Sequence, residues 1–127
     1  MKKATREWVG KAEADYQAAV ELASVSKPFH DQVSFLCQQS AEKYLKALLE
    51  ELTLAIAKTH ELDRLLDELR PHHPGLRSLR RGLLFLTNFA VEPRYPGNAT
   101  SKRQATSALR WAGKVRQACR TLLGVAV

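Results

Sequence analysis

The sequence predicts an all-α fold, an antiparallel up-and-down four-helix bundle with an additional short helix. Apolar residues recur at three- and four-residue steps over long stretches, whereas the alternating β-branched runs typical of strands do not occur. Only five prolines and six glycines interrupt 127 residues, of which 45% are hydrophobic. Such a chain can bury a core of its own, so residues 1–127 are expected to form a single domain.

The first two helices are expected over residues 5–23 and 29–52, separated by the break Ser26-Lys27-Pro28. Asp15 falls inside the apolar arc of the first helix, where a carboxylate needs a partner because burying an unpaired charge is costly. Two interpretations of Asp15 stay open. It forms a buried salt bridge or hydrogen bond that fixes one helix on another, or it is one wall of a polar pocket.

Three further helices are expected over residues 60–69, 76–91 and 102–123. Thr59 precedes the first of these and has the side chain of an N-cap. A loop with two prolines precedes the last helix, because proline biases the residue before it away from helical geometry.

The residue patterns predict neither a metal site, nor a cofactor, nor a membrane-spanning segment. Cys37 and Cys119 lie on predicted apolar faces without a CxxC pair or zinc spacing, so both are expected to be small buried hydrophobes. His72 and His73 are adjacent in a loop, where their side chains diverge. We expect no metal site and no cofactor. No signal peptide and no apolar run of membrane-spanning length is visible, so a cytoplasmic location is expected.

A candidate nucleotide site centres on His60 and on the loop segment Arg94-Tyr95-Pro96. An arginine and an aromatic ring on a proline-stiffened loop can bind a phosphate and stack on a base. The alternative is a loop anchor, in which Arg94 pairs with an acid such as Asp15. His60 either packs locally at a helix start or faces a nucleotide or partner. The full candidate set, with two lysines that would extend a positive rim, is Asp15, Lys43, Lys46, His60, Arg94 and Tyr95.

A candidate RNA-binding surface lies on the polar side of the last helix. The net charge is +7, which suits an anionic partner such as RNA, a nucleotide or an acidic protein surface. Arg103, Arg110 and Lys114 fall on one side of this helix at helical spacing. Such a face is either an RNA-binding surface or simply solvated.

A homodimer is expected from the second helix. Phe35 and Leu49 lie off its main apolar side, and a helix with a second apolar patch often contacts another chain.

Three short motifs occur in a characteristic order along the chain. They are Gln38-Gln39-x-Ala41-Glu42-Lys43-x-Leu45-Lys46-Ala47-Leu48, then Thr59-His60-x-Leu62, then Arg94-Tyr95-Pro96. Together they resemble the HEPN family, small helical domains of prokaryotes that often occur beside a minimal nucleotidyltransferase. The resemblance runs from about Trp8 to Leu123. It implies a helical bundle and a minimal nucleotidyltransferase as partner.

Many ribonucleases of this family carry an arginine, a gap of four to six residues and then a histidine. None of the histidines here has an arginine at that distance upstream. We therefore expect a non-catalytic HEPN protein that dimerises, binds a minimal nucleotidyltransferase and contacts a nucleotide or RNA. The alternative is a ribonuclease toxin of a toxin–antitoxin pair, acting through an unrecognised constellation around His60 and Arg94. A third interpretation is a plain interaction module without a ligand.

Overall fold

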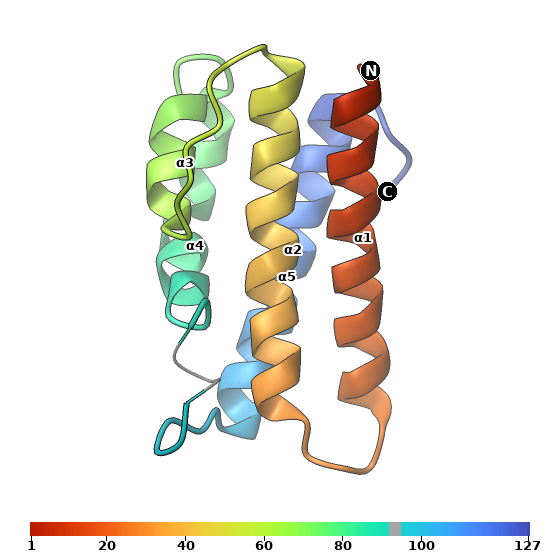
Figure 1. Cartoon of the computed structure of the whole chain (residues 1–127), viewed down its shortest axis with the longest axis vertical. Helices are drawn as coiled ribbons and strands as arrows, with labels where there is room; N and C mark the ends of the chain where they lie inside the picture. Colours follow the sequence, from red (N-terminus) through yellow and green to blue (C-terminus); the bar gives the residue numbers. More distant parts are fainter. Residues whose placement is uncertain (92–94) are drawn as a thin grey trace.

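The computed structural model describes residues 1–91 and 95–127, and its regular secondary structure within these ranges is entirely helical (Figure 1). The predicted all-α helical bundle with an additional short helix is confirmed. In chain order the elements are α1 (Lys3–Ser24), α2 (His30–Glu51), α3 (Leu62–Leu69), the 3₁₀ helix η1 (Pro74–Leu79), α4 (Arg80–Thr87) and α5 (Lys102–Leu123).

Helix α2 is the centre of the bundle and contacts α1, α3, α4 and α5 (Figure 1). An extended segment, residues 53–61, leaves the C-terminal end of α2 and runs back along the bundle. It starts where the Leu54 N–H donates to the Leu49 carbonyl at 2.9 Å, and it ends beside Gln38. This return places the start of α3 near the middle of α2, which is where the functional residues gather.

The three long helices match their predicted ranges to within two residues. The last is reproduced over residues 102–123, with a capping box in which the Gln104 N–H donates to Ser101 Oγ and the Ser101 N–H donates to the Gln104 side chain. Gly124 ends this helix at φ 72°, a left-handed conformation that glycine adopts without strain.

The two short helices differ from prediction. The third begins at Leu62 rather than at residue 60, and Thr59 does not cap it. Instead Thr59 Oγ accepts a hydrogen bond from the Glu61 N–H at 3.1 Å, which stabilises a turn before the helix. The fourth is divided into η1 and α4 and ends at Thr87, because Pro74 and Gly75 favour a tight 3₁₀ start over a regular α-helix.

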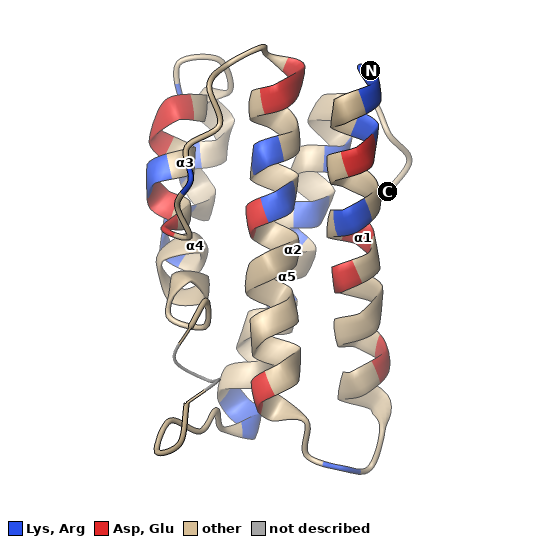
Figure 2. Cartoon of the chain, in the orientation of Figure 1, with Lys and Arg blue, Asp and Glu red and all other residues tan. Residues whose placement is uncertain are grey.

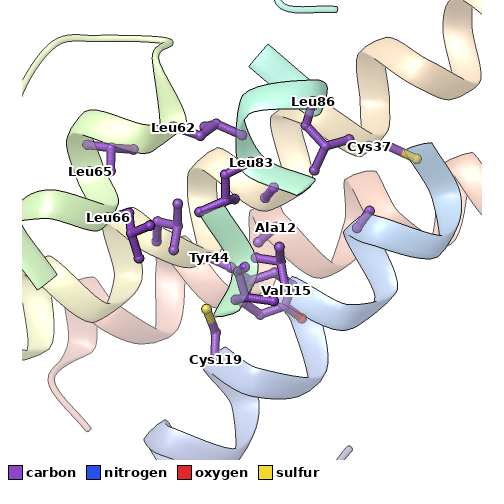
Figure 3. Close-up of a cluster of buried hydrophobic side chains, with 14 of the residues drawn as sticks. Ala12, Cys37, Tyr44, Leu62, Leu65, Leu66, Leu83, Leu86, Val115 and Cys119 are labelled. Atoms are coloured by element: carbon purple, nitrogen blue, oxygen red, sulfur yellow. The ribbon is translucent and has the colours of Figure 1, made fainter. Parts of the chain in front are cut away.

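Leucines and alanines from all the helices fill the core (Figure 3). Cys37 and Cys119 are fully buried and free, as predicted, and burial raises the pKa of the Cys37 thiol to about 12. Trp111 of α5 lies flat on α4 at Gly82, where an added Cβ would lie 2.0 Å from Trp111 Cε3. The close approach of α4 to α5 therefore requires glycine at this position.

The pair expected to mark a dimer interface is only partly as predicted. Leu49 is fully buried inside the protomer, whereas Phe35 is half-buried. The prediction for Leu49 is wrong because 13 of the 22 residues of α2 are buried, on more than one side of the helix. No described helix is both long and apolar enough to cross a membrane.

Candidate functional site

A buried carboxylate on α2 organises a polar cluster midway along the bundle. We call it the Glu42 cluster, and its members are Gln38, Glu42, Lys46 and His60. The first three occupy successive four-residue steps of α2, so they share one face of that helix. Lys46 Nζ lies 2.9 Å from Glu42 Oε2, while Gln38 Nε2 and His60 Nδ1 lie 3.0 and 2.8 Å from Glu42 Oε1.

His60 is fixed by both its ring and its backbone. Gln38 Nε2 also donates to the His60 carbonyl at 3.3 Å, and Gln39 Nε2 donates to Gln38 Oε1 at 2.7 Å. Because Glu42 is a carboxylate acceptor, the neutral imidazole carries its proton on Nδ1 and presents Nε2 as an acceptor. The His60 side chain is 61% exposed, so Nε2 is the atom of the cluster that a ligand can reach.

The charges inside the Glu42 cluster are balanced. Burial alone would raise the pKa of Glu42, but hydrogen bonds from Lys46, His60 and Gln38 outweigh it and lower that pKa below its usual value. Glu42 is therefore anionic at neutral pH and offsets the charge of the buried Lys46. Lys46 Nζ also lies 5.9 Å from the ring centroid of Trp8, which is half-buried on α1. The surface of the cluster is thus an imidazole, with an indole at its edge.

Asp15 has a different partner from those predicted. Its Oδ2 atom lies 2.5 Å from Lys43 Nζ, and this ion pair joins α1 to α2. The contact has the geometry of the salt-bridge interpretation. This ion pair also neutralises Lys43, whose charge was predicted to extend a positive rim around the candidate nucleotide site. Arg94 lies outside the described residues, so its role stays a prediction.

Tyr95 is exposed, in a loop at the start of α5. The Thr100 N–H donates to Asp31 Oδ1 at 2.7 Å, which fixes the end of this loop at the first turn of α2. Asp31 precedes Glu42 by 11 residues, about 16 Å along a helix. The described contacts therefore connect Lys46 and His60 through Glu42 and join Asp15 to Lys43, and they do not bring Tyr95 to either pair.

A second, partly buried carboxylate cluster, which sequence reasoning missed, ties α1, α2 and α5 together. We call it the Glu13 cluster, and its members are Glu13, Tyr44, Arg116 and Arg120. Arg116 donates to both Glu13 oxygens at 2.7 and 2.9 Å, and the Tyr44 hydroxyl donates to Glu13 Oε1 at 2.5 Å. Arg120 Nη1 donates to the Tyr44 hydroxyl at 3.1 Å.

Burial alone would raise the pKa of Glu13, but the hydrogen bonds from Arg116, Tyr44 and Gln17 lower it to about 2. One sequence signal for this cluster was available, because Arg116 and Arg120 flank the apolar side of α5 one turn apart. The matching signal for the Glu42 cluster was the four-residue spacing of Gln38, Glu42 and Lys46.

The predicted RNA-binding residues Arg103, Arg110 and Lys114 are all exposed on α5. Arg110 Cζ and Lys114 Nζ lie 5.7 and 4.8 Å from the centroid of Trp111. Trp111 in turn packs on Gly82, which follows Arg81 of α4. Helix α4 therefore packs beside this part of α5. Figure 2 shows that Lys and Arg also occur on α1 and α2, interspersed there with acids.

Among residues 1–91 and 95–127, no group of three or more His, Cys, Asp or Glu side chains has a metal-binding arrangement.

Comparison with known proteins adds a family assignment. The model of the HEPN domain matches residues 5–122. A crystal structure of TT1696 from Thermus thermophilus is similar, with a TM-score of 0.84 and 23% identity, covering 94% of this chain and 98% of that chain. The structure of ST0689, an archaeal HEPN homologue, gives a TM-score of 0.77 and 22% identity, covering 96% and 98%. At these identities the likeness shows the fold. No curated protein matches the chain significantly.

Proposed function

The chain belongs to the HEPN family, and we propose that it acts as a non-catalytic HEPN protein that dimerises and binds a minimal nucleotidyltransferase. We further propose that a nucleotide or RNA meets the protein at the Glu42 cluster. The observation that carries this proposal is the exposed His60 ring, held in one orientation by a buried and fully hydrogen-bonded carboxylate. An imidazole pre-positioned in this way loses little freedom when a ligand binds.

The environment of His60 fits a nucleotide better than a small anion. Lys46 and Glu42 offset each other, so the cluster has little net attraction for a bare phosphate. His60 Nε2 can accept a hydrogen bond from a base or sugar hydroxyl, or donate one to phosphate when protonated. The Trp8 ring, which lies 5.9 Å from Lys46 Nζ, is an aromatic surface at the edge of the cluster on which a base can pack. A ligand that carries a base and a phosphate can use both the hydrogen bond at His60 and the aromatic surface of Trp8.

The non-catalytic assignment rests on the cation beside His60. Cleavage of RNA requires a positive group that stabilises the charge developing on the phosphate. In the Glu42 cluster this group is Lys46, which is buried and already paired with Glu42 at 2.9 Å. The described residues place no arginine in contact with His60, and the arginine–histidine spacing of the ribonuclease members is absent from the sequence.

Binding at His60 is tested by calorimetric titration with ATP and with a single-stranded RNA. The variant is His60→Gln, and the matched control is the adjacent Glu61→Gln, whose carboxylate pairs only with the exposed Arg64 in the described contacts. We expect about tenfold weaker binding for His60→Gln and no change for the control. If His60→Gln and the control bind the ligand with equal affinity, the ligand does not bind at His60.

Partner binding is tested by determining whether the adjacent gene encodes a minimal nucleotidyltransferase, co-expressing that protein with this chain and analysing the mixture by size-exclusion chromatography. Dimerisation is tested by sedimentation of the wild type and of Phe35→Glu, with the exposed Leu84→Glu as a control on another helix. A stable hetero-complex and a dimer that only Phe35→Glu weakens are the expected results. A monomeric wild type with no complex would end this part of the proposal.

A second candidate function is favoured by one specific contact. A carboxylate that accepts from Nδ1 of a histidine orients the other ring nitrogen as a general base, and Glu42 holds His60 in this way. Such a pair could take a proton from the 2′-hydroxyl of RNA, as expected of a ribonuclease toxin. Cleavage of RNA that is lost in His60→Ala and in Glu42→Gln would establish this alternative in place of the non-catalytic proposal.

A further inference from the structure

An open apolar groove that shares no residue with the Glu42 cluster lies between η1 and the C-terminal half of α5. Its volume is about 630 Å³. Apolar side chains from both elements line it, and they are Leu76, Leu79, Ala118 and Leu122. Leu122 is 44% exposed, which is unusual for a leucine beside a core and leaves its side chain available to another molecule.

The C-terminal residues of the chain do not fill this groove. After Gly124 the backbone turns, and the Val125 N–H donates to the Arg120 carbonyl at 2.9 Å. Arg120 Nε then donates to the Ala126 carbonyl at 2.6 Å, and Arg116 Nη1 donates to the Val127 carbonyl. These contacts hold the tail against the Glu13 cluster, on another side of α5. Figure 1 shows the C-terminus beside α1.

The ionisable residues that line the groove are all basic or neutral. They are His72, His73 and Lys114, and the lining contains no described acid. Arg110 lies one turn from Lys114, and both cations pack on the Trp111 ring. On the other side of η1, Asp67 is already bound to Arg80 at 2.6 Å and to Arg70 at 3.8 Å. Burial and the neighbouring His72 lower the pKa of His73, which favours its neutral form, so Lys114 is the permanent cation of the lining and Arg110 is a second cation one turn beyond it. The groove therefore combines an apolar floor with a cationic rim formed by Lys114 and, next to it, Arg110.

We propose that this groove binds an acidic amphipathic helix of a partner protein. The apolar floor takes the leucine-like side chains of that helix, and the rim pairs with its carboxylates. RNA fits less well, because a phosphate backbone gains nothing from an apolar floor. A second copy docked symmetrically through this groove also fits less well, since it would bring the Lys114 side chains of both copies close together.

The order of the side chains along α5 fixes the direction in which the partner helix would bind. Arg110, Lys114, Gln117 and Thr121 recur at three- and four-residue steps and form one stripe of α5, of which the last three line the groove and Arg110 lies one turn beyond it. The cations occupy the end of the stripe nearer Trp111, and the neutral residues lie beside Leu122. The helix that binds should thus carry its acids toward the Trp111 end and its apolar anchors toward Leu122.

The probe for this proposal is a fluorescein-labelled helical peptide with leucines at i, i+3, i+4 and i+7 and glutamates flanking them. Binding to the full chain is followed by fluorescence anisotropy. A scrambled peptide of the same composition and a labelled single-stranded RNA serve as comparison ligands. The variants are Leu122→Glu and Lys114→Glu, and Lys102→Glu is the matched control because it makes the same change of charge at the exposed start of α5.

We expect saturable binding of the patterned peptide, at least about tenfold weaker binding by Leu122→Glu and Lys114→Glu, and less than about a twofold change for Lys102→Glu. Thermal melts confirm that each variant is folded. Any of four results would overturn the proposal: no saturable binding, equal binding of the scrambled peptide, wild-type binding by both groove variants, or tighter RNA binding that the groove variants abolish. Loss of a wild-type dimer in Leu122→Glu would also overturn it, because the groove would then belong to a second copy.

Discussion

The Glu13 and Glu42 clusters are two solutions to the same problem, a carboxylate placed between helices. In both clusters hydrogen-bonding donors lower the pKa of the glutamate despite its burial. They differ in the exposure of their partners. Arg116 and Arg120 keep only 17% and 14% of their side chains exposed, whereas His60 keeps 61%. The Glu13 cluster is closed on itself, and the Glu42 cluster ends in a group that solvent and ligands reach.

This difference shows why a perturbed carboxylate is weak evidence for a functional site. Glu13 has the strongly lowered pKa, about 2, yet its partners Tyr44 and Arg116 serve to join α1, α2 and α5. Glu42 has the feature that matters for function, because it orients a side chain that is still available. We therefore expect the Glu13 cluster to contribute mainly to stability and the Glu42 cluster mainly to binding.

The largest expected effect is the loss of stability in Glu13→Ala. This change strands Arg116 and removes the acceptor of the Tyr44 hydroxyl. Breaking a buried pair typically costs about 3–5 kcal/mol, and because a quarter of the Glu13 side chain is exposed we expect about 2–3 kcal/mol. Urea denaturation measures the change, and Glu7→Ala, an exposed position on the same helix, is the control. Equal stability of the two variants would contradict a structural role for the Glu13 cluster.

Acid should weaken the Glu13 cluster over a defined window. The pKa of Glu13 is lowered from 4.5 to about 2, so its contribution is present above pH 4.5 and is lost as the pH falls toward 2. A shift of this size corresponds to roughly 3 kcal/mol, an order of magnitude only. Denaturation curves of the wild type and of Glu13→Gln should therefore converge between pH 4.5 and 2. Parallel curves over that window would show that the carboxylate is unpaired.

Glu42→Gln should cost less stability, about 1–2 kcal/mol. The amide keeps a hydrogen bond to Lys46 or His60, but it leaves the buried Lys46 charge without an anion. The same change should release the His60 ring from its fixed orientation. Thermal denaturation gives the first effect, and broadening of the His60 side-chain NMR signals gives the second. A stability loss as large as that of Glu13→Ala would make the two clusters equivalent.

His60→Gln should change stability least, by less than about 0.5 kcal/mol, because its side chain is mostly exposed. Ligand binding should fall in the same variant although the fold is intact. Chemical denaturation and calorimetric titration of one preparation give both numbers. A stability loss above about 2 kcal/mol would mean that His60 is a structural residue.

The sequence predicted what depends on local pattern. Apolar periodicity places α1, α2 and α5, because each is long enough for the pattern to be unambiguous. It failed for α3 and α4, which are only eight residues each, where Thr59 prefers a turn and Pro74 starts a 3₁₀ helix. Leu49 was wrongly predicted to lie at a dimer interface, because the central helix α2 is covered by other helices on more than one side. Only the packing of the whole bundle shows this.

The candidate site was predicted in part for a related reason. His60 and Lys46 were identified from motifs, and they do lie together. The partner of Asp15 could not be inferred, because Lys43 meets it through the packing of two helices. Glu13 and Arg116 are 103 residues apart, so no local pattern could have paired them.

The most direct test of the account is residue-resolved NMR of the protein titrated with ATP and, separately, with a single-stranded RNA. We predict that the chemical-shift changes gather at Trp8, at residues 39–46 and at His60, whose ring signals move most, while the signals of the Glu13 cluster stay unchanged. Changes confined to the basic face of α5 around Arg103 and Arg110, changes at Glu13 and Tyr44, or no changes at all would contradict the assignment of ligand binding to the Glu42 cluster.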